Sequence, residues 1–564
     1  MDLKTRGLAP SPSERESIES VLGPAGGDVG RDRVGGGSLR ARRHLLLPTL
    51  HAVNDRIGWI SPAAIDHIAE RLDVSPAEIY GVVTFYGLFS TQERPERQGH
   101  ACVDLVCRSR GVSEDRLPDG VHPSPCLGMC EQAPAVLVTE AGDPARRVSL
   151  GDVSVERLGN LDAVPAPRRP IPQAGDPDLV LLARAGRIAP LDFVAWVADG
   201  GLDALARARE IGADAVIDLV DAAGLLGRGG AAFPTATKWR AVRDQAATPR
   251  HLVCNADESE PGTFKDRVLI ENDPFALLES MTIAALAADC THGWIYLRGE
   301  YPGVEATLAT AIEVFRREGI LGDGFDIRLR RGAGAYICGE ETAIFNSIEG
   351  FRGEPRNKPP YPFEEGLFAL PTAVNNVETL MNVPSIVLGR ATSNRRVFCL
   401  SGAIARPGVY EVELGLTLGE LIERAGGLPT GSELRAVLLG GAAGRYVSPH
   451  SLDLVLDHES VRAAGLSLGS GVVMVLDQHV DLVDQIRRIA AFFRDESCGQ
   501  CVPCRVGTVR QEEALERLTD GVRDGQLELL ADIGRAMTDA SICGLGQTAH
   551  HAIESAVTLG AFER

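Results

Sequence analysis

The sequence predicts a multidomain protein built from α/β and α+β units, with helical segments near both ends. Its 564 residues leave room for three or four domains, and 44% are hydrophobic, as in ordinary globular proteins. Apolar runs alternate with helical patterns over about 179–390. From 481 onward, apolar residues such as Leu482, Ile486 and Ile489 recur at helical spacing.

The first 178 residues divide into three predicted parts. Residues 1–37 are glycine-rich and charged with little periodicity, which indicates a disordered or partner-bound tail. Residues 38–160 begin as helices, with an N-cap at Ser61 and a capping box at Ser75–Glu78, and continue from about 99 as a small α/β unit. Residues 161–178 are proline-rich and predict a linker.

Three further units follow the linker. The α/β unit spans 179–392, and its glycine-rich loop at 224–234 follows a helical pattern at 213–223 rather than a strand. An ordinary Rossmann fingerprint leaves a strand, so we expect a different nucleotide fold here. A compact β-grasp-like unit is predicted at 393–480, with a helix opened by a Thr417/Glu420 capping box, and a helical domain at 481–564.

Charge and hydropathy exclude two classes of protein. The formal net charge of −20 argues against nucleic-acid binding, because no basic block offsets it locally. No apolar run reaches membrane-spanning length, so direct membrane insertion is not expected. The start does not resemble a secretory signal, and we expect a cytoplasmic protein.

Four cysteines near the C-terminus have the spacing of an iron–sulfur site. Cys498, Cys501 and Cys504 form C-x2-C-x2-C, and Cys543 follows at a distance. Three thiolates so spaced can cap one face of a cubane and the fourth completes a [4Fe-4S] set, with glycines nearby to bring backbone N–H groups to the sulfides. Zinc is the alternative, although zinc sites usually pair two C-x2-C knuckles.

A second set, Cys102, Cys107, Cys126 and Cys130, forms two pairs separated by 18 residues. Two pairs suit the two irons of a [2Fe-2S] cluster, with structural zinc again the alternative. His122 lies nearby and is interpreted as an exposed loop histidine rather than a ligand. Four single cysteines in apolar contexts are expected to pack in the core: Cys254, Cys290, Cys338 and Cys399.

The glycine-rich loop and the acidic string after it, 255–263, together predict a nucleotide and flavin cradle. Glycines let backbone N–H groups approach phosphate, which Arg228 and Lys238 can neutralise. The acidic and amide side chains of the string offer partners for ribose hydroxyls and a heterocycle. Alone, the glycine loop is equally compatible with a simple turn.

Two more strings, 334–342 and 371–380, complete a resemblance. With the loop, the acidic string and the C-terminal cysteines, they resemble the family of NADH-oxidising flavin subunits of respiratory complex I, which also supplies the diaphorase subunits of NAD-reducing hydrogenases and NAD-dependent formate dehydrogenases. The resemblance covers about 180–564. Residues 40–160 resemble the thioredoxin-like [2Fe-2S] protein that partners these flavin subunits, here fused, and the fusion favours the hydrogenase or formate dehydrogenase diaphorases.

The resemblance implies the cofactors FMN, NAD, [4Fe-4S] and [2Fe-2S]. A carboxylate such as Glu260 near the adenosine ribose would repel a 2′-phosphate, so NAD is expected over NADP. The implied NADH contacts are Phe233, by stacking, with Glu260, Lys358 and Tyr361. The implied FMN contacts are Gly227, Arg228, Gly229, Lys238, Asn255, Asp257, Ser259, Tyr336, Gly339, Glu340, Glu341, Asn375 and Asn376.

This sequence departs from the family pattern in two places. Lys238-Trp239 lacks the second aromatic that usually follows, so one stacking wall is expected from elsewhere in the chain. The 18-residue gap between the N-terminal cysteine pairs is also short, which suggests a trimmed domain that still holds its cluster.

The expected function is that of a diaphorase. Hydride passes between NAD and FMN and single electrons pass through the clusters, with no catalytic acid or base. The expected complex is a hetero-oligomer, either single or dimerised, in which the chain is the beta subunit of a cytoplasmic NAD-dependent formate dehydrogenase. Its partner would carry a catalytic metal centre, of formate dehydrogenase alpha or hydrogenase type, and further iron–sulfur clusters. The alternatives are a flavin subunit of a NAD-reducing hydrogenase or of complex I, and, from a different class, a non-catalytic metal-binding scaffold.

Overall fold

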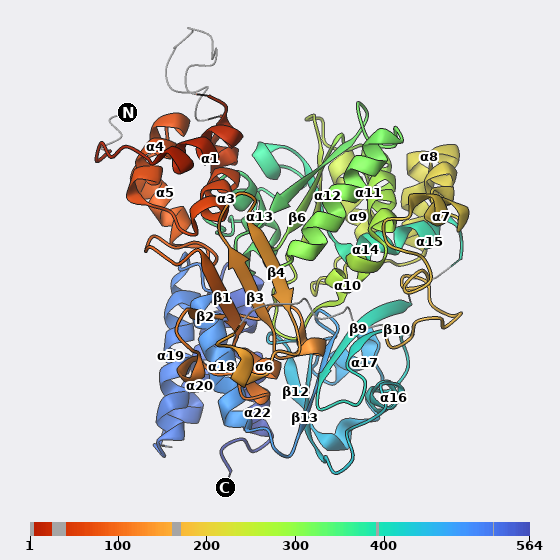
Figure 1. The fold of residues 1–564 in the computed structure, drawn as a ribbon. Helices are drawn as coiled ribbons and strands as arrows, with labels where there is room; N and C mark the ends of the chain where they lie inside the picture. Colours follow the sequence, from red (N-terminus) through yellow and green to blue (C-terminus); the bar gives the residue numbers. More distant parts are fainter. Residues whose placement is uncertain (1–4, 25–40, 161–170, 391–393, 523, 564) are drawn as a thin grey trace.

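The computed structural model describes residues 5–24, 41–160, 171–390, 394–522 and 524–563. Within them the chain forms an N-terminal group of helices, three β-sheets and a C-terminal group of helices (Figure 1). The predicted multidomain α/β and α+β fold is confirmed. The three sheets belong to three successive segments of the chain, and the N- and C-terminal helices pack beside the first sheet (Figure 1).

The N-terminal helices are α1 (Pro12–Leu22), α3 (Leu46–Ile57), α4 (Pro62–Leu72) and α5 (Pro76–Val83). The Ser61 N-cap and the Ser75–Glu78 capping box are both present, as predicted. Helix α1 corrects the prediction of an irregular tail over 1–37. It opens with its own capping box and buries Ile18 and Leu22, packing on α3 and α4. Residues 25–37 of the predicted tail lie outside the described residues.

The first sheet has the order β2-β1-β3-β4, and the N-terminal cysteines lie at the end of β1 and in the segments that follow β1 and β2. β1 pairs parallel to β2, and antiparallel pairing joins β1 to β3 and β3 to β4. His122 lies on edge strand β2, half-buried and opposite His100, so its interpretation as an exposed loop histidine was wrong. The strands are β1 (Arg97–Cys102), β2 (Val121–Ser124), β3 (Val136–Glu140) and β4 (Arg146–Leu150), with α6 at Leu105–Ser109.

The linker predicted at 161–178 is described only from Ile171, where the chain forms turns. Gln173 is anchored to strand β10 (Gly408–Glu413), since its amide group both donates to the Glu411 carbonyl and accepts from the Glu411 N–H, at 3.2 and 2.7 Å. The described end of this segment is therefore held against the β-grasp-like unit.

The second sheet is fully parallel, in the order β7-β6-β5-β8. Its central strands β5 (His251–Ala256) and β6 (His292–Leu297) are almost entirely buried, as expected when helices cover both faces. The edge strands are β7 (Asp326–Arg331) and β8 (Thr372–Asn376). The helices are α7 (Phe193–Ala198), α8 (Asp203–Ala222), α9 (Thr235–Arg243), α10 (Lys265–Asn272), α11 (Pro274–Ala288), α12 (Pro302–Arg317), α13 (Glu341–Ile348), α14 (Val377–Met381) and α15 (Val383–Val387), with the 3-10 turn η5 at Tyr336–Gly339.

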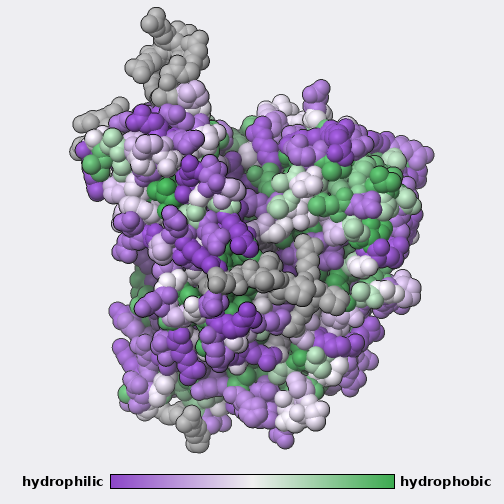
Figure 2. Space-filling model, in the orientation of Figure 1, coloured by the Kyte–Doolittle hydropathy of each residue, from purple (hydrophilic) through white to green (hydrophobic). Residues whose placement is uncertain are grey.

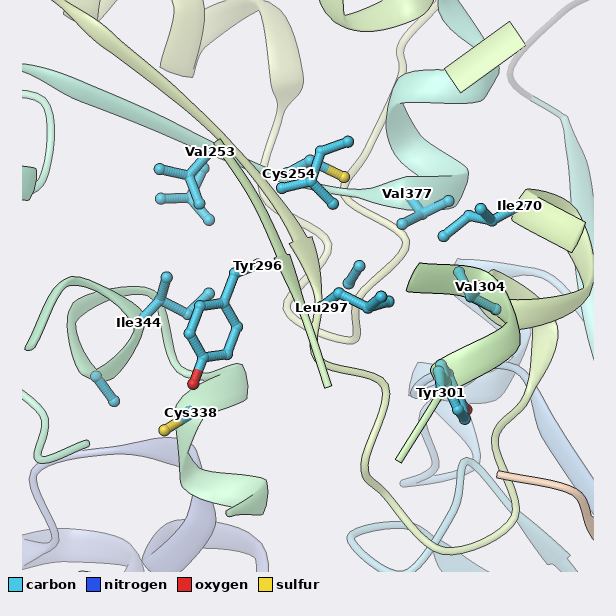
Figure 3. Packing of buried hydrophobic residues seen from close by; sticks show 14 of the residues in the cluster. Val253, Cys254, Ile270, Tyr296, Leu297, Tyr301, Val304, Cys338, Ile344 and Val377 are labelled. Carbon is cyan, nitrogen blue, oxygen red and sulfur yellow. The ribbon is translucent and has the colours of Figure 1, made fainter. Parts of the chain in front are cut away.

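Figure 3 shows side chains packing against this sheet. Tyr296 points toward Ile344 and Cys338, while Val377, Ile270 and Val304 lie to the other side of the strands (Figure 3). The cysteines expected in the core are indeed buried, with Cys254 and Cys399 at 0% exposure.

The third sheet, β10-β9-β13-β11-β12, confirms the β-grasp-like prediction. Parallel pairing of β9 and β13 joins the antiparallel β9–β10 pair to the antiparallel group β13-β11-β12, and α16 (Leu418–Arg424) begins with the predicted Thr417/Glu420 capping box. The strands are β9 (Arg395–Gly402), β10 (Gly408–Glu413), β11 (Leu434–Leu439), β12 (Arg445–Val447) and β13 (Val472–Asp477), with α17 at His458–Ala463.

The C-terminal helices are α18 (Leu482–Asp495), α19 (Val502–Thr519), α20 (Gln526–Ala540), α21 (Gly544–Thr548) and α22 (His551–Thr558). Helix α18 packs its predicted apolar stripe against α19 and α22.

None of the helices in the described part of the chain is long and apolar enough to cross a membrane. Figure 2 shows a largely polar face, with apolar residues gathered over the region of α7 and α8, where Val194 is 79% exposed.

Candidate functional site: a nucleotide cradle between two sets of thiols

The glycine-rich loop joins α8 to α9, so it closes a helix as predicted. The loop folds back on itself through a hydrogen bond from the Gly227 N–H to the Phe233 carbonyl at 2.9 Å. Gly229 lies against Asn376 at the end of β8, and an added Cβ would stand 3.4 Å from the Asn376 Cβ. The loop therefore passes over the carboxyl end of the parallel sheet, where such sheets bind ligands.

The end of β5 supplies the polar wall of this cradle. Asn255 donates from Nδ2 to the Gly339 carbonyl at 2.8 Å, and its Oδ1 accepts from the Asp257 N–H at 3.1 Å. Ser259 donates to Asp257 Oδ1 at 3.2 Å. A Cβ on Gly339 would approach the Asp257 carbonyl to 3.5 Å, so the η5 turn and the acidic string lie in contact.

Asp257 carries an acceptor suited to a bound hydroxyl. Burial raises the pKa of this carboxyl well above its usual value, and its Oδ2 is buried without a hydrogen-bond partner among the described residues. A buried acceptor left unpaired costs roughly 1–3 kcal/mol. A donor from a ligand, such as a ribityl hydroxyl of FMN, would satisfy it, so the residues present fit the flavin.

Two lysines and two glutamates face the cradle. Lys238 donates to the Val374 carbonyl at 2.9 Å and lies 3.5 Å from Glu341, while Lys358 contacts Glu340 at 3.1 Å and Glu341 at 2.7 Å. Burial works against the charged form of Glu341, yet Lys238 and Lys358 together hold its pKa below the usual value. Phe233 is 50% exposed, and Lys238 Nζ lies 5.8 Å from the centre of its ring.

Three further predicted FMN residues also have side chains engaged within the protein. Arg228 is buried and donates to the Arg395 carbonyl at 3.1 Å, so its guanidinium lies toward β9. Asn375 accepts from the Trp239 indole at 2.9 Å, and Asn376 accepts from Lys265 at 3.4 Å. The phosphate role of Arg228 stays a prediction, whereas Lys238 lies beside the glycine-rich loop, near the Phe233 ring.

The predicted NADH residues divide between two places. Phe233 and Lys358 lie at the cradle with the lysine–glutamate group, and Tyr361, 46% exposed, stacks on Phe363 with centroids 5.6 Å apart. Glu260 instead faces the β-grasp-like domain, where it accepts from the Ser470 hydroxyl at 2.7 Å and the Ala443 N–H at 3.0 Å. The preference for NAD that was argued from Glu260 therefore stays a prediction.

The N-terminal thiols converge at one end of the first sheet. Cys102 ends β1, Cys107 lies in α6, and Cys126 Sγ is 3.5 Å from Cys130 Sγ. Neighbouring thiols of Cys102 and Cys130 hold the pKa of Cys126 well below its usual value. All four are buried, and the Gly128 N–H points at Cys126 Sγ at 3.4 Å. Four clustered thiols with backbone N–H support fit a [2Fe-2S] group.

The C-terminal thiols line a single pocket. Cys501 is the N-cap of α19, Cys504 lies in its first turn, and Cys543 is the N-cap of α21, so two helix N-termini bring them to Cys498. A Cβ on Gly546 would lie only 2.9 Å from the Cys504 Cβ, which keeps the α21 backbone close. In the described residues no three His, Cys, Asp or Glu side chains are placed to hold a single metal ion. The thiols surround a pocket, as a [4Fe-4S] group requires.

The η5 turn separates the cradle from the C-terminal pocket. Gly339 at its end contacts Asn255 in the cradle, while Ile337 lines the pocket with Cys498 and Cys543. The Tyr336 N–H donates to Glu496 at 2.8 Å, and its ring packs on Phe492 of α18 with centroids 5.2 Å apart. The nucleotide cradle and the pocket are thus neighbours across one short turn.

Sequence reasoning missed a buried charged network between the cradle and the N-terminal thiols. Its members are fully or nearly buried, and burial raises the pKa of Glu258 to about 7. Their sequence neighbourhood carries no signal beyond charge, because the network forms only when three elements meet. It consists of Glu131, Glu258, Arg267, Arg298, Glu300 and Tyr301.

This arrangement defines a class of protein. A flavin-type cradle next to one iron–sulfur pocket, with a second thiol set across a buried network, is that of an oxidoreductase subunit that converts between hydride and single-electron transfer.

Comparison with known proteins gives the family. Matching family models are the Nuo51 FMN-binding domain at 220–385, the NADH-ubiquinone oxidoreductase-F iron-sulfur binding region at 484–562, the thioredoxin-like [2Fe-2S] ferredoxin at 37–117 and the SLBB domain at 397–443. The chain belongs to the family of NADH-oxidising flavin and iron–sulfur subunits. Its cofactors are accordingly FMN, [4Fe-4S] and [2Fe-2S]. Structural zinc, the alternative considered for both sets of cysteines, is thereby excluded.

Individual relatives support the same assignment. An NADH-quinone oxidoreductase subunit of Aquifex aeolicus (strain VF5) is 42% identical over 66% of this chain and 90% of its own length. The NADP-reducing hydrogenase subunit HndC of Solidesulfovibrio fructosivorans is 40% identical over 64% of this chain and 78% of its own. A chain of the H2-reduced NAD+-reducing [NiFe]-hydrogenase superposes with a TM-score of 0.78 at 31% identity, covering 93% of each chain.

Proposed function

We propose that the chain is the NAD-reactive diaphorase subunit of a hetero-oligomeric enzyme whose partner chain holds a catalytic metal centre. The supporting observation is the likeness to the NAD+-reducing [NiFe]-hydrogenase chain, which extends over 93% of both proteins and so includes the fused N-terminal region. This favours a partner that oxidises hydrogen. The formate dehydrogenase role expected from the sequence is the second candidate, because fusion of the two regions is compatible with both.

The described residues account for binding and positioning. Bound FMN supplies hydride acceptance and one-electron release. Lys238 and the loop N–H groups would hold the flavin phosphate, Asp257 would accept from a ribityl hydroxyl, and Phe233 offers an exposed ring for stacking.

The surface next to the C-terminal pocket is suited to the partner. Val502, Val506 and Val509 form an exposed stripe along α19, at 59%, 45% and 38% exposure, and Ile542 borders the pocket. Exposed apolar residues in a row mark an interaction site more often than scattered ones do. A partner seated there would bring its own cluster beside Cys501 and Cys543, which are half-buried.

The test is purification of the native complex followed by metal analysis and paired assays. Nickel together with hydrogen-dependent NAD reduction supports the hydrogenase proposal, and molybdenum or tungsten together with formate-dependent NAD reduction supports the formate alternative. A chain that oxidises NADH with ferricyanide but copurifies with neither partner contradicts both. Repeating the assays with NADP tests the expected preference for NAD. The cytoplasmic location expected from the sequence stays a prediction.

A further inference from the structure

A buried arginine joins the [2Fe-2S] ligand loop to the flavin side of the molecule. Arg298 follows β6 and is 2% exposed. Its Nη2 donates to the Cys126 carbonyl at 2.6 Å, and its Nη1 donates to the Glu258 carbonyl, also at 2.6 Å. Cys126 is one of the thiols predicted to hold the [2Fe-2S] cluster, and Glu258 lies between the cradle residues Asp257 and Ser259 in the sequence. One guanidinium therefore bridges the two redox sites.

A second arginine holds the same loop from α10. Arg267 donates from Nε to the Gly128 carbonyl at 2.9 Å and pairs with Glu131 and, at 3.0 Å, with Glu271. Gly128 has a φ of +62°, and a Cβ there would overlap the Tyr301 hydroxyl. The loop between Cys126 and Cys130 thus packs directly against the Arg267 and Tyr301 side chains, and no space remains at Gly128 for a side chain.

We propose that Arg298 is a positioning residue for the [2Fe-2S] cluster, which fixes the Cys126 loop on the flavin-side segment and favours the reduced cluster through its charge. Reduction adds one electron to a group already made negative by four thiolates. A buried cation near that group stabilises the added charge more than water would, because the protein interior screens weakly.

The other charges near the loop set the sign of the effect. Glu300 pairs with Arg298 at 2.9 Å and partly offsets it. Asp104 accepts from the Cys126 N–H at 2.6 Å and is itself paired with Arg488. Removing the Arg298 charge leaves Glu300 without its cation, so the surroundings become more negative and the reduced cluster less stable.

The experiment is a redox titration of the purified full-length holoprotein, followed by electron paramagnetic resonance of the reduced [2Fe-2S] cluster. In Arg298→Gln we expect the ratio of reduced to oxidised cluster at a fixed ambient potential to fall roughly tenfold, about 59 mV for a one-electron couple. Arg298→Lys keeps the charge and should restore most of the ratio. A ratio in Arg298→Gln equal to wild type, with the cluster bound, overturns the proposal.

Two further variants keep the test decisive if Arg298→Gln does not fold. Glu300→Gln leaves Arg298 in place and removes the offsetting charge, so the ratio should rise, and an unchanged or lower ratio contradicts the proposal. Arg330→Gln is the matched control, because Arg330 is also buried and donates to a backbone carbonyl, that of His44 at 2.9 Å, away from both thiol sets. Its ratio should match wild type, and an equal shift there overturns the proposal.

The role of Arg298 rests on the [2Fe-2S] assignment, and the two failures are distinguishable. If the wild-type holoprotein gives no [2Fe-2S] resonance, the cluster assignment fails, and with it the role of Arg298. If the resonance is present but does not respond to the charge at 298 or 300, only the role of Arg298 is overturned.

Discussion

Lys238 illustrates how one side chain can prepare a site for an anion. Its ammonium group is held by the Val374 carbonyl and faces the exposed Phe233 ring, while Glu341 lies 3.5 Å away. The sequence favours this position because a lysine after a glycine loop suits phosphate, and the fold places it beside that loop. Arg228 is also a cation that could neutralise a phosphate, but its side chain is buried toward β9. Residue type alone does not reveal which way a side chain turns.

Replacing Lys238 with methionine should weaken FMN binding. Loss of a charge-assisted contact is worth about 1.5–3 kcal/mol, so the dissociation constant should rise ~10–100-fold. Flavin fluorescence on titration of deflavinated protein measures it. Lys358→Met is the control: it removes the other lysine that pairs with Glu341, and we expect it to raise the KM for NADH while FMN stays bound. Equal loss of FMN in both variants would contradict the separate roles.

Glu260 gives a pH-dependent prediction. Burial raises its pKa to about 7, against a usual value of 4.5, despite the Ser470 and Ala443 hydrogen bonds. Because the folded protein binds this proton more tightly than the unfolded chain, the contribution of Glu260 to stability falls as pH rises from about 4.5 to above 7. Glu260→Gln lacks this dependence.

The measurement compares the thermal stability of wild type and Glu260→Gln at pH 5 and pH 8. The wild type should lose ~2 kcal/mol relative to the variant between those conditions. Other buried carboxyls with raised pKa values, such as Glu279 and Glu496, titrate in both proteins and so cancel in the difference. A difference that does not change with pH would falsify the prediction.

At the scale of elements, the sequence predicted those helix starts that depend on hydrogen bonds between residues close together in the chain. The capping boxes at Ser75 and Thr417 mark the starts of α5 and α16, because they satisfy backbone N–H groups within one turn. Helix α1 was missed although its own capping box is present at Ser11, since the surrounding glycines and charges masked it and its stability comes from packing on α3. β2 was missed because a four-residue edge strand with a proline has no alternation to detect.

Helix α21 provides a test at this scale. Gly546→Ala would push a methyl group against the Ser541 hydroxyl and the Cys504 Cβ, so we expect loss of the [4Fe-4S] cluster with FMN and [2Fe-2S] retained. Gly544→Ala in the same helix is the matched control, because nothing lies within 4 Å of its added Cβ. Iron content and the reduced-cluster resonances distinguish the variants. A retained [4Fe-4S] signal in Gly546→Ala would contradict this prediction, because it would mean that α21 can shift to accommodate the methyl group.

At the scale of the whole molecule, the order of domains and the grouping of thiols could be predicted from the sequence, but the contacts between domains could not. The four C-terminal cysteines could be grouped by spacing, whereas the adjacency of their pocket to the cradle through η5 required the fold. The Arg298 bridge likewise joins residues 172 positions apart in the chain. Such contacts depend on how finished elements pack, and no local pattern specifies them.

The valine stripe on α19 makes a prediction about assembly. Val506→Asp should weaken association with the partner chain, since it places a charge in the centre of the proposed interface, while NADH oxidation with ferricyanide continues. Val194→Asp on α7 is the control, because that valine is even more exposed but far along the chain from the cluster ligands. Copurification and partner-dependent NAD reduction measure the effect. Intact complex in Val506→Asp would place the partner elsewhere.

The fusion of the N-terminal region has a consequence for how the enzyme matures. The Gly87 and Leu88 N–H groups donate to the Gly334 and Ala333 carbonyls at 2.9 and 3.0 Å, directly before the η5 turn. The N-terminal part of the chain therefore braces the wall of the flavin cradle. When such parts are separate polypeptides they must meet by diffusion and in matched amounts, whereas a covalent tether supplies an effective concentration on the order of millimolar. Each flavin cradle is therefore made together with the N-terminal segment that supports it. Unequal synthesis of two separate chains cannot leave a cradle without that segment.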